Sequence, residues 1–223
     1  MPANSLPTIL LIRHAETQWN IEGRLQGWRD APLTLNGFRQ AIAVAENVRK
    51  TWAGLALDGG VQYHCSDLGR ARQTSSILAD CWGIRFGQFM AEEQIKERNY
   101  GAWEGMTLDE VAQSRPNEFQ DHQADPWGYQ VPGGEAKTAL FDRISAWLDE
   151  LPRNRTHVVV THSGCFRAIR GAYVNSTRAE IDAYREPQTT SFLLREGIAR
   201  EIAMSPVLAE QFQLSKKALT VAI

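Results

Sequence analysis

Two short runs of apolar and β-branched residues each end in a histidine, and this repeated arrangement constrains the fold more than any other feature. The first run covers 8–12 and continues into Arg13 and His14, and the second covers 156–160 and leads to His162. Continuous apolar runs of this length are typical of strands buried on both faces of a parallel sheet. Ligands of open α/β sheets bind beyond the carboxyl ends of the strands. We therefore expect both histidines at the mouth of one site.

Further predicted strands and helices alternate along the chain, which is typical of the α/β class. Strands are expected at 61–65, 84–89, 189–195 and 198–204, the last two as a hairpin that turns at Glu196 and Gly197. Helices are expected at 38–52, within 66–80, from Thr107 for a short stretch, at 135–151 and after His162. The last 15 or so residues are expected to form a tail.

Two stretches between these elements lack a sustained hydrophobic period. Residues 21–35 contain Gly23, Gly27 and Pro32, and residues 115–136 contain three prolines and a Gly-Gly pair. Long loops inside compact domains are usually functional. We therefore expect 21–35 to be an ordered loop beside the site and 115–136 to be irregular.

Local sequence also predicts how the helices begin and which faces they bury. Thr34 or Asn36 is expected to cap the helix that follows it. Ser66 and Asp67 are of the capping type and precede the next helix. His122 lies in the irregular stretch and is expected at the surface. The apolar face of the helix at 38–52 is expected to consist of Phe38, Ala41, Ile42, Ala45 and Val48.

Length and composition favour one large α/β domain over 1–223, with loop or cap segments at about 21–35 and 104–135. The formal net charge of -2 gives no reason to expect a nucleic acid or an anionic membrane as partner. The three cysteines form no close pair and no metal-binding spacing, as in reduced cytoplasmic proteins. The first apolar run is only five residues long, so we expect a soluble, cytoplasmic protein without a membrane span. The oligomeric state is left open.

The pair Arg13-His14 indicates phosphoryl chemistry. A neutral imidazole nitrogen can attack phosphorus, and an adjacent guanidinium can hold two phosphoryl oxygens at once. The alternative for the pair alone is a histidine that caps the sheet beside an arginine in solvent, since strand ends are polar in any α/β protein. The second histidine, His162, makes that alternative much weaker.

Two further charged residues are predicted to join this site. Arg70 lies in the first turn of a helix, where a cation is unfavourable beside the positive end of the helix dipole unless an anion is shared between them. The alternative is a solvated arginine, which suits Arg72 better than Arg70. Glu97 lies in a polar loop, 96–99, before two glycines.

These residues fall in four blocks whose order and content resemble the histidine phosphatase superfamily, also called the phosphoglycerate mutase-like family. The blocks RHAET, SDLGRARQT, KERNYGAWEG and THSG match the family patterns RHGE[ST], S-x-L-x-R-A-x-Q-T, E-x-x-x-G-x-W-E-G and [ST]-H-x-G. The resemblance extends from about Thr8 to Met204 and implies a three-layer α/β/α fold, with a mostly parallel sheet flanked by helices. Ala15 replaces the usual glycine and Ala136 replaces a common serine.

The resemblance also implies a mechanism that needs neither a metal nor a cofactor. His14 would attack the phosphoryl group in line and form a phosphohistidine, while Glu97 would protonate the leaving alkoxide and later activate water. Arg13, Arg70 and His162 would stabilise the charge of the transition state. Positions that match substrate-binding residues of relatives are Thr17, Asn20, Gln26, Gly27, Tyr100 and Ser163.

Within this family a phosphatase is favoured over a mutase. In the mutase branch an arginine pair assists the binding of phosphoglycerate, whereas the corresponding region here, 105–127, offers only Arg115. The WEG and PGGE motifs also resemble the phosphatase branch. The leading alternative is a cofactor-dependent phosphoglycerate mutase, and the second is a noncatalytic anion-binding α/β domain.

The expected substrate is a small phosphorylated metabolite, whose identity the motifs leave open. Trp28, Trp103 and Trp127 permit an apolar or ring-bearing alcohol portion. Arg24 or Arg29 could hold a second acidic group. Both hypotheses concern the loops around the site, which vary freely on a fixed scaffold.

Overall fold

The computed structural model describes residues 6–52, 60–186, 188–189 and 191–202. Its six-stranded sheet has the strand order β3-β2-β4-β1-β5-β6. Strands β1 to β4 run parallel, and β5 and β6 form an antiparallel hairpin beside β1, so the expected mostly parallel sheet is confirmed. The strand bounds are β1 (Thr8–Arg13), β2 (Val61–Ser66), β3 (Phe89–Glu92), β4 (Thr156–Thr161), β5 (Ser191–Arg195) and β6 (Ile198–Ile202).

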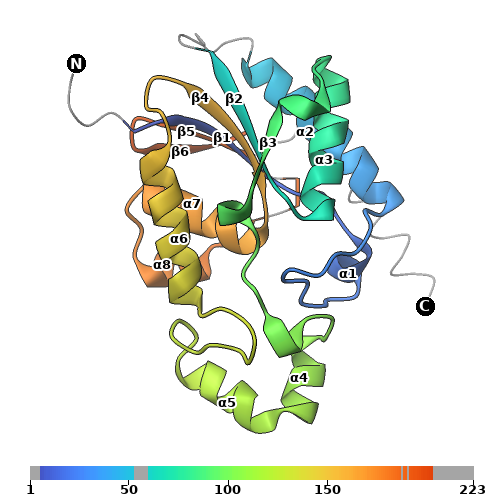
Figure 1. Cartoon of the computed structure of the whole chain (residues 1–223), viewed down its shortest axis with the longest axis vertical. Helices are drawn as coiled ribbons and strands as arrows, with labels where there is room; N and C mark the ends of the chain where they lie inside the picture. The colour runs from blue at the N-terminus through green and yellow to red at the C-terminus, as the bar shows by residue number, and fades with distance from the viewer. Residues whose placement is uncertain (1–5, 53–59, 187, 190, 203–223) are drawn as a thin grey trace.

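Helices cover both faces of the sheet (Figure 1). Along β1, Ile9 and Leu11 pack in one core cluster with α6 and α7, whereas Leu10 and Ile12 pack in another with α2 and α3. This alternation follows from the two-residue period of a strand that is buried on both faces. The helices of these layers are α2 (Leu35–Trp52), α3 (Gly69–Trp82), α6 (Lys137–Glu150), α7 (Ser163–Tyr173) and α8 (Arg178–Ala183).

A small helical lobe extends below the sheet in Figure 1 and contains α4 (Leu108–Ser114) and α5 (Pro116–Ala124). Thr107 caps α4 through a capping box with Glu110, so the predicted start of a short helix is confirmed. The prediction that 115–136 is irregular is wrong for α5. Pro116 stands at the first position of that helix, where its fixed φ is already helical and its missing N–H costs nothing.

The third strand was predicted at 84–89, and this prediction is wrong. Gly83 ends α3 in the left-handed conformation, with φ of 69°, and a 3₁₀ turn (Phe86–Gln88) follows. Ile84, just before this turn, and Phe86, within it, pack against the core, so their apolar character reflects burial and not a strand. The strand β3 begins only at Phe89.

Helix α2 begins at Leu35, three residues before the predicted start, and the Thr34 hydroxyl accepts the Gly37 N–H at 2.9 Å, as a capping residue does. Its predicted apolar face is partly wrong. Phe38 and Ile42 are 46% and 45% exposed, and the buried face is made of Ala41, Val44, Ala45 and Val48. Val44, Ala45 and Val48 pack in the core cluster that also contains Leu10 and Ile12 of β1.

The predicted hairpin turn at Glu196 and Gly197 is confirmed, because both have positive φ values of 53° and 76°. That pair of conformations matches the right-handed twist of two strands joined by two residues. The predicted tail and the last two residues of the strand at 198–204 lie outside the described residues. In the part of the chain that is described, no helix is long and apolar enough to cross a membrane.

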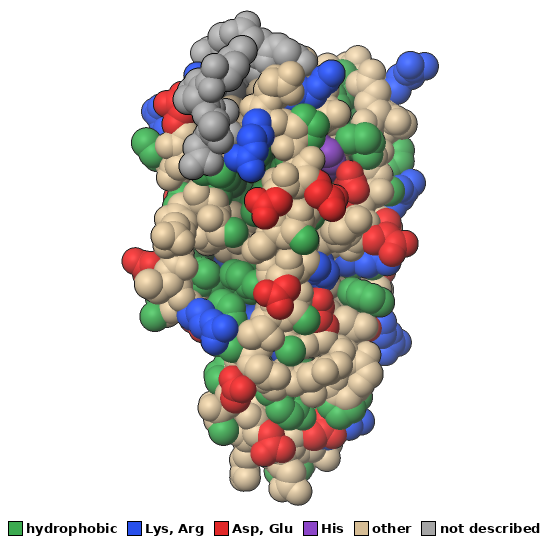
Figure 2. All heavy atoms as spheres, turned by 60° about the vertical axis from the view of Figure 1, so that its left-hand side comes forward, with side chains coloured by type: hydrophobic (Ala, Val, Ile, Leu, Met, Phe, Trp, Pro, Cys, Tyr) green, Lys and Arg blue, Asp and Glu red, His purple; other side chains and the backbone are tan. Residues whose placement is uncertain are grey.

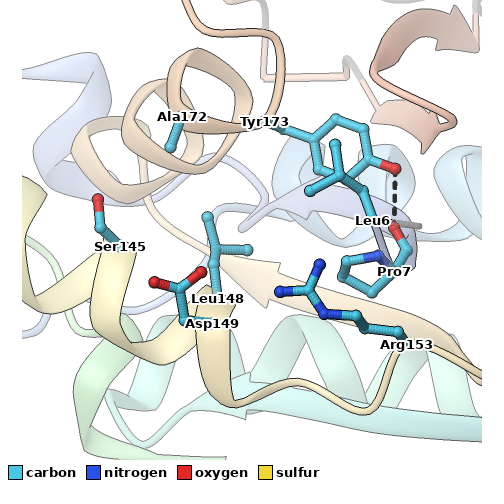
Figure 3. A pocket seen from close by; sticks show the side chains of 8 residues that line it. All are labelled: Leu6, Pro7, Ser145, Leu148, Asp149, Arg153, Ala172 and Tyr173. Carbon is cyan, nitrogen blue, oxygen red and sulfur yellow. Dashed lines mark hydrogen bonds between the residues drawn. The ribbon is translucent and has the colours of Figure 1, made fainter. Parts of the chain in front are cut away.

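Two features of the surface complete the fold. Acidic and basic side chains are intermingled on the face in Figure 2, with no extended area of one charge. A cavity of about 200 Å³ lies at the amino end of β1, where the Tyr173 hydroxyl donates to the Pro7 carbonyl at 2.8 Å (Figure 3). This cavity lies at the opposite end of β1 from the histidines.

The corrected face of α2 predicts the effect of two substitutions on the free energy of unfolding. Val48→Ala removes two methyl groups from a fully buried site and should cost about 2 kcal/mol. Ile42→Ala, on the same helix but half exposed, should cost less than about 0.5 kcal/mol. Urea denaturation of the two variants measures both values. Equal losses would contradict the orientation of α2.

Candidate active site

The two predicted histidines lie side by side because their strands are neighbours. Arg13 pairs with Thr161 in the parallel register of β1 and β4, and the His14 N–H donates to the Thr161 carbonyl at 2.7 Å. The imidazole rings of His14 and His162 have centroids 5.2 Å apart. Both side chains are buried, with exposed fractions of 3% and 0%. The carboxyl edge of the sheet therefore brings together residues nearly 150 positions apart.

One hydrogen bond fixes the tautomer of His14. The ring Nδ1 lies 2.8 Å from the carbonyl oxygen of Ala15, which can only accept, so Nδ1 carries the proton. In the neutral ring Nε2 then carries no proton, and its lone pair is available. A neutral imidazole with a defined lone pair is the form that can act as a nucleophile.

His162 is held by a different partner. Its Nε2 lies 2.7 Å from the hydroxyl of Ser66, the last residue of β2, at the same sheet edge. Its Nδ1 is buried and has no protein partner among the described residues. When the Ser66 hydroxyl donates to Nε2, Nδ1 carries a proton and can donate to an oxygen atom in the site.

Arg13 is oriented by Glu186, a residue that the sequence analysis missed. Its Nη1 donates to the Glu186 carbonyl at 3.1 Å and lies 3.5 Å from the Glu186 carboxylate. The Ser163 hydroxyl donates to the same carboxylate. Glu186 lies in the segment after α8, and no local pattern there indicates its role. Only the fold, which returns this segment to the sheet edge, reveals it.

Arg70 is held by Asp30, which is the second residue that the sequence analysis missed. Asp30 accepts the Gly69 N–H at 2.6 Å and the Arg70 N–H at 3.2 Å, and its Oδ1 lies 2.9 Å from Arg70 Nη1. The prediction that Ser66 or Asp67 caps this helix is wrong. The N-cap residue is Leu68, whose side chain makes no capping hydrogen bond. The anion shared by the helix end and Arg70 is therefore a carboxylate of the chain itself.

The carbonyl oxygens of the loop 21–35 complete the support of Arg70. Its Nη2 donates to the Gly27 carbonyl at 2.7 Å and its Nη1 to the Arg29 carbonyl at 2.8 Å. Gly27 has a φ of 56°, and a Cβ atom there would overlap the Glu104 carboxylate. Glycine is therefore required at this turn, which gives the predicted ordered loop a structural basis.

Glu97 is fixed by two backbone donors. Its Oε1 accepts the Arg98 N–H at 2.8 Å, and its Oε2 accepts the Gly164 N–H at 3.0 Å from the first turn of α7. The side chain reaches the same cavity as His14. A carboxyl group with this fixed orientation is suited to moving a proton at a defined position.

Arg13, His14, Arg70 and Glu97 line a cavity of about 190 Å³, whereas His162 is not among its lining residues and lies beside it against His14. The buried Nε atoms of Arg13 and Arg70 lack protein partners among the described residues, as does His162 Nδ1. Buried donors are normally satisfied, so a cluster of unsatisfied donors fits a ligand with several acceptor oxygens. The cavity is lined by Arg13, His14, Asn20, Arg24, Leu25, Gln26, Gly27, Arg70, Glu97, Tyr100 and Ser163.

Five of the six predicted substrate-binding residues line this cavity, and Thr17 does not. Thr17 is fully buried behind it, where it caps α1 (Gln18–Ile21) by accepting the Asn20 N–H. It also accepts from the Gln26 side chain at 2.8 Å. Thr17 thus positions Asn20 and Gln26 without reaching the cavity.

The two departures from the family pattern have simple consequences. Ala15 is not among the described residues with positive φ, and its methyl group packs with Leu33 and Ala41. Alanine is therefore compatible with this backbone. Ala136 is the N-cap of α6 and makes no side-chain cap, so the missing serine hydroxyl would have stood at the start of that helix.

Burial and the arginines control protonation in the site. Desolvation, followed by the charges of Arg70 and Arg13, holds the pKa of His14 well below its usual value. Desolvation and Arg70 do the same to the pKa of His162. Both rings are therefore neutral near pH 7 when the site is free. In the described part of the chain, no group of three or more His, Cys, Asp or Glu side chains is arranged to hold a metal ion.

Comparison with known proteins identifies the family of this site. Residues 9–196 match the model of the histidine phosphatase superfamily, branch 1. A protein of Yersinia pestis named probable phosphoglycerate mutase GpmB is 34% identical over 163 residues, which are 70% of this chain and 71% of that protein.

Solved structures show the same fold. An alpha-ribazole phosphatase from Shigella flexneri superposes with a TM-score of 0.71 at 21% identity, over 86% of this chain and 93% of its own. Bacillus stearothermophilus YhfR superposes with a TM-score of 0.68 at 26% identity, over 87% and 94%.

The lowered pKa values of the two histidines predict a loss of stability in acid. Below pH 6.5 the unfolded chain binds protons at His14 and His162 that the folded chain does not, so the free energy of unfolding falls as the pH falls. At pH 5 each group contributes a loss of up to about 2 kcal/mol.

Urea denaturation in phosphate-free buffer of constant ionic strength measures this loss. His14→Asn and His162→Asn should each reduce the difference between the free energies of unfolding at pH 7 and pH 5. Variants with the wild-type difference would show that these rings are not held neutral by the fold.

Proposed function

The chain belongs to branch 1 of the histidine phosphatase superfamily, and we propose that it is a metal-independent phosphomonoesterase acting on small phosphorylated metabolites. The observation that carries the proposal is the neutral His14, whose unprotonated Nε2 shares a cavity with unsatisfied guanidinium donors. A phosphoryl group has the acceptor oxygens and the electrophilic centre that such a cavity suits.

In the proposed first step, His14 Nε2 attacks phosphorus and forms a phosphohistidine while the alcohol leaves. Negative charge on the equatorial oxygens is stabilised by Arg13, Arg70 and His162 Nδ1–H, which are held before the reaction begins. Uncatalysed hydrolysis of phosphate monoesters is among the slowest known reactions, so several preorganised donors are needed.

In the proposed mechanism Glu97 moves the protons of both steps. It donates a proton to the leaving alkoxide and then accepts one from the water that attacks the phosphohistidine. Its two backbone bonds keep the carboxyl group at one place through both steps. The proton returns to Glu97, so the cycle closes with free phosphate and the alcohol as products.

A cofactor-dependent phosphoglycerate mutase is the second candidate. It is favoured by the name of the Yersinia relative, probable phosphoglycerate mutase GpmB. Against it, Arg115 is the only arginine of the region 105–127, and its guanidinium pairs with Glu118 at 2.9 Å within the lobe. We therefore favour the phosphatase.

An assay of phosphate release tests the proposal. In the presence of EDTA the wild-type protein should release phosphate from p-nitrophenyl phosphate, and His14→Ala should lower kcat at least about 1,000-fold because the nucleophile is lost. Mass spectrometry of acid-quenched enzyme should find the phosphoryl group on the peptide that contains His14.

The same preparation should be tested with 3-phosphoglycerate and a trace of 2,3-bisphosphoglycerate. Rapid formation of 2-phosphoglycerate with little free phosphate would favour the mutase. Absence of both activities, with circular dichroism showing a folded protein, would favour a noncatalytic anion-binding domain.

The cavity lined by His14, Arg70 and Glu97 is called the phosphoryl cavity below. The contacts of Asp30, which lies outside this cavity, predict an effect on catalysis. Asp30→Ala should lower kcat/KM for p-nitrophenyl phosphate about 10- to 100-fold, because Arg70 loses a charged partner that fixes its position. Asp80→Ala, at an exposed position on α3, the helix that carries Arg70, is the control and should keep the wild-type value. A wild-type kcat/KM in Asp30→Ala would show that the remaining carbonyl partners suffice.

A further inference from the structure

A second, larger cavity adjoins the phosphoryl cavity. It has a volume of about 450 Å³, and Leu25 and Tyr100 line both cavities. Ser163 lines the smaller one and Gly164 the larger one, and the Gly164 N–H binds the Glu97 carboxylate at 3.0 Å. A phosphate ester bound at His14 would therefore extend its alcohol portion past Glu97 into the larger cavity.

Part of the lining of this larger cavity is apolar. Leu25, Leu108 and Leu140 contribute aliphatic groups, and Tyr100 and His122 contribute rings. His122 is half-buried against Trp103 and not at the surface as predicted. Cavities of about 300–1,000 Å³ hold drug-sized ligands, so a three-carbon acid would fill only a small part of this one.

The lining of the larger cavity also includes several cations, most of which already have partners. Arg98 donates to the carbonyls of Glu135 and Tyr129. Lys137 pairs with Asp182, and Arg185 donates to the Asp182 carbonyl. These three cations are therefore engaged in holding the lobe and α8 in place.

Arg167 differs from them. It lies on α7, and its polar contacts within the described part of the chain are those of Nε, which lies 3.4 Å from the Ser163 carbonyl and 3.7 Å from the Glu186 carboxylate. Its two terminal nitrogens make no hydrogen bond with any described residue, and the side chain is 24% exposed. A guanidinium whose two terminal nitrogens lack such partners, beside a cavity, is suited to bind an anionic group through two parallel hydrogen bonds.

The arginines that the sequence suggested for this role are occupied. Arg24 pairs with Glu22 and Glu110 at 2.8 and 2.7 Å. The Arg29 guanidinium contacts the Glu104 carbonyl and lies 5.5 Å from the Trp19 ring centroid.

We propose that the larger cavity binds an alcohol portion consisting of an apolar, ring-sized body and an acidic group, and that Arg167 binds that acidic group. This proposal rests on the proposed phosphatase function. The acidic group is a carboxylate or a second phosphate, since both offer the pair of oxygens that two parallel hydrogen bonds require.

Matched esters test the proposal: benzyl phosphate, 4-carboxybenzyl phosphate and the bisphosphate of benzene-1,4-dimethanol. The wild-type kcat/KM should be about 10- to 100-fold higher for at least one acid-bearing ester than for benzyl phosphate. The ester that is preferred identifies the acidic group.

Variants then assign the preference to Arg167. The preference is the ratio of kcat/KM for the preferred acid-bearing ester to kcat/KM for benzyl phosphate. Arg167→Met keeps much of the aliphatic stem and should reduce this ratio to about one. Arg167→Lys should keep part of the preference, because lysine supplies a single point charge. Arg195→Met, in the exposed hairpin, is the control and should keep the full preference. Thermal unfolding of each variant verifies that it is folded.

Two results would overturn the proposal: equal kcat/KM for all three esters in the wild type, or full preference in a folded Arg167→Met variant. Failure of the phosphatase function itself is distinguishable. In that case none of the three esters would be hydrolysed in a reaction that depends on His14.

Discussion

The parallel pairing of β1 with β4 is the interaction on which the site depends. It sets Arg13 opposite Thr161, and the next residue of each strand is a histidine. The His14 N–H continues the ladder by binding the Thr161 carbonyl. A shift of one residue in the pairing of β1 would turn each of its side chains to the other face of the sheet. The two apolar clusters that pack on β1 therefore also fix where both histidines lie.

This arrangement concentrates cations in a buried place, which is unfavourable without compensation. Burial lowers the pKa of Arg13 and of Arg70, and the carboxylates of Glu186 and Asp30 oppose that effect. Each carboxylate also binds a second group of the site: Glu186 accepts the Ser163 hydroxyl, and Asp30 accepts the N–H groups that begin α3. The same bonds therefore offset the burial of charge and fix the geometry.

The sequence predicted the sheet edge well because its signals are local. A β-branched run followed directly by a histidine defines both the strand and the position of the side chain at its end, as at His162. Glu186 and Asp30 could not be predicted in this way, because they lie 173 and 40 residues from the arginines that they bind. The third strand was misplaced for a related reason. Apolar residues in a 3₁₀ turn that packs on the core have the composition of a buried strand.

The two adjoining cavities divide the work between different parts of the fold. The phosphoryl cavity is lined by residues at strand ends and helix starts and by the loop residues 24–27, whereas part of the lining of the larger cavity comes from the lobe between Arg98 and Lys137. Glu97 lies at the boundary, bound to Gly164, and in the proposed mechanism it protonates the ester oxygen that leaves with the alcohol. Substitutions in the lobe can therefore change which alcohol is accepted while the distance from Glu97 to His14 stays the same. In the proposed function the chemistry therefore belongs to the sheet edge, and the choice of alcohol belongs to the lobe together with Arg167 of α7.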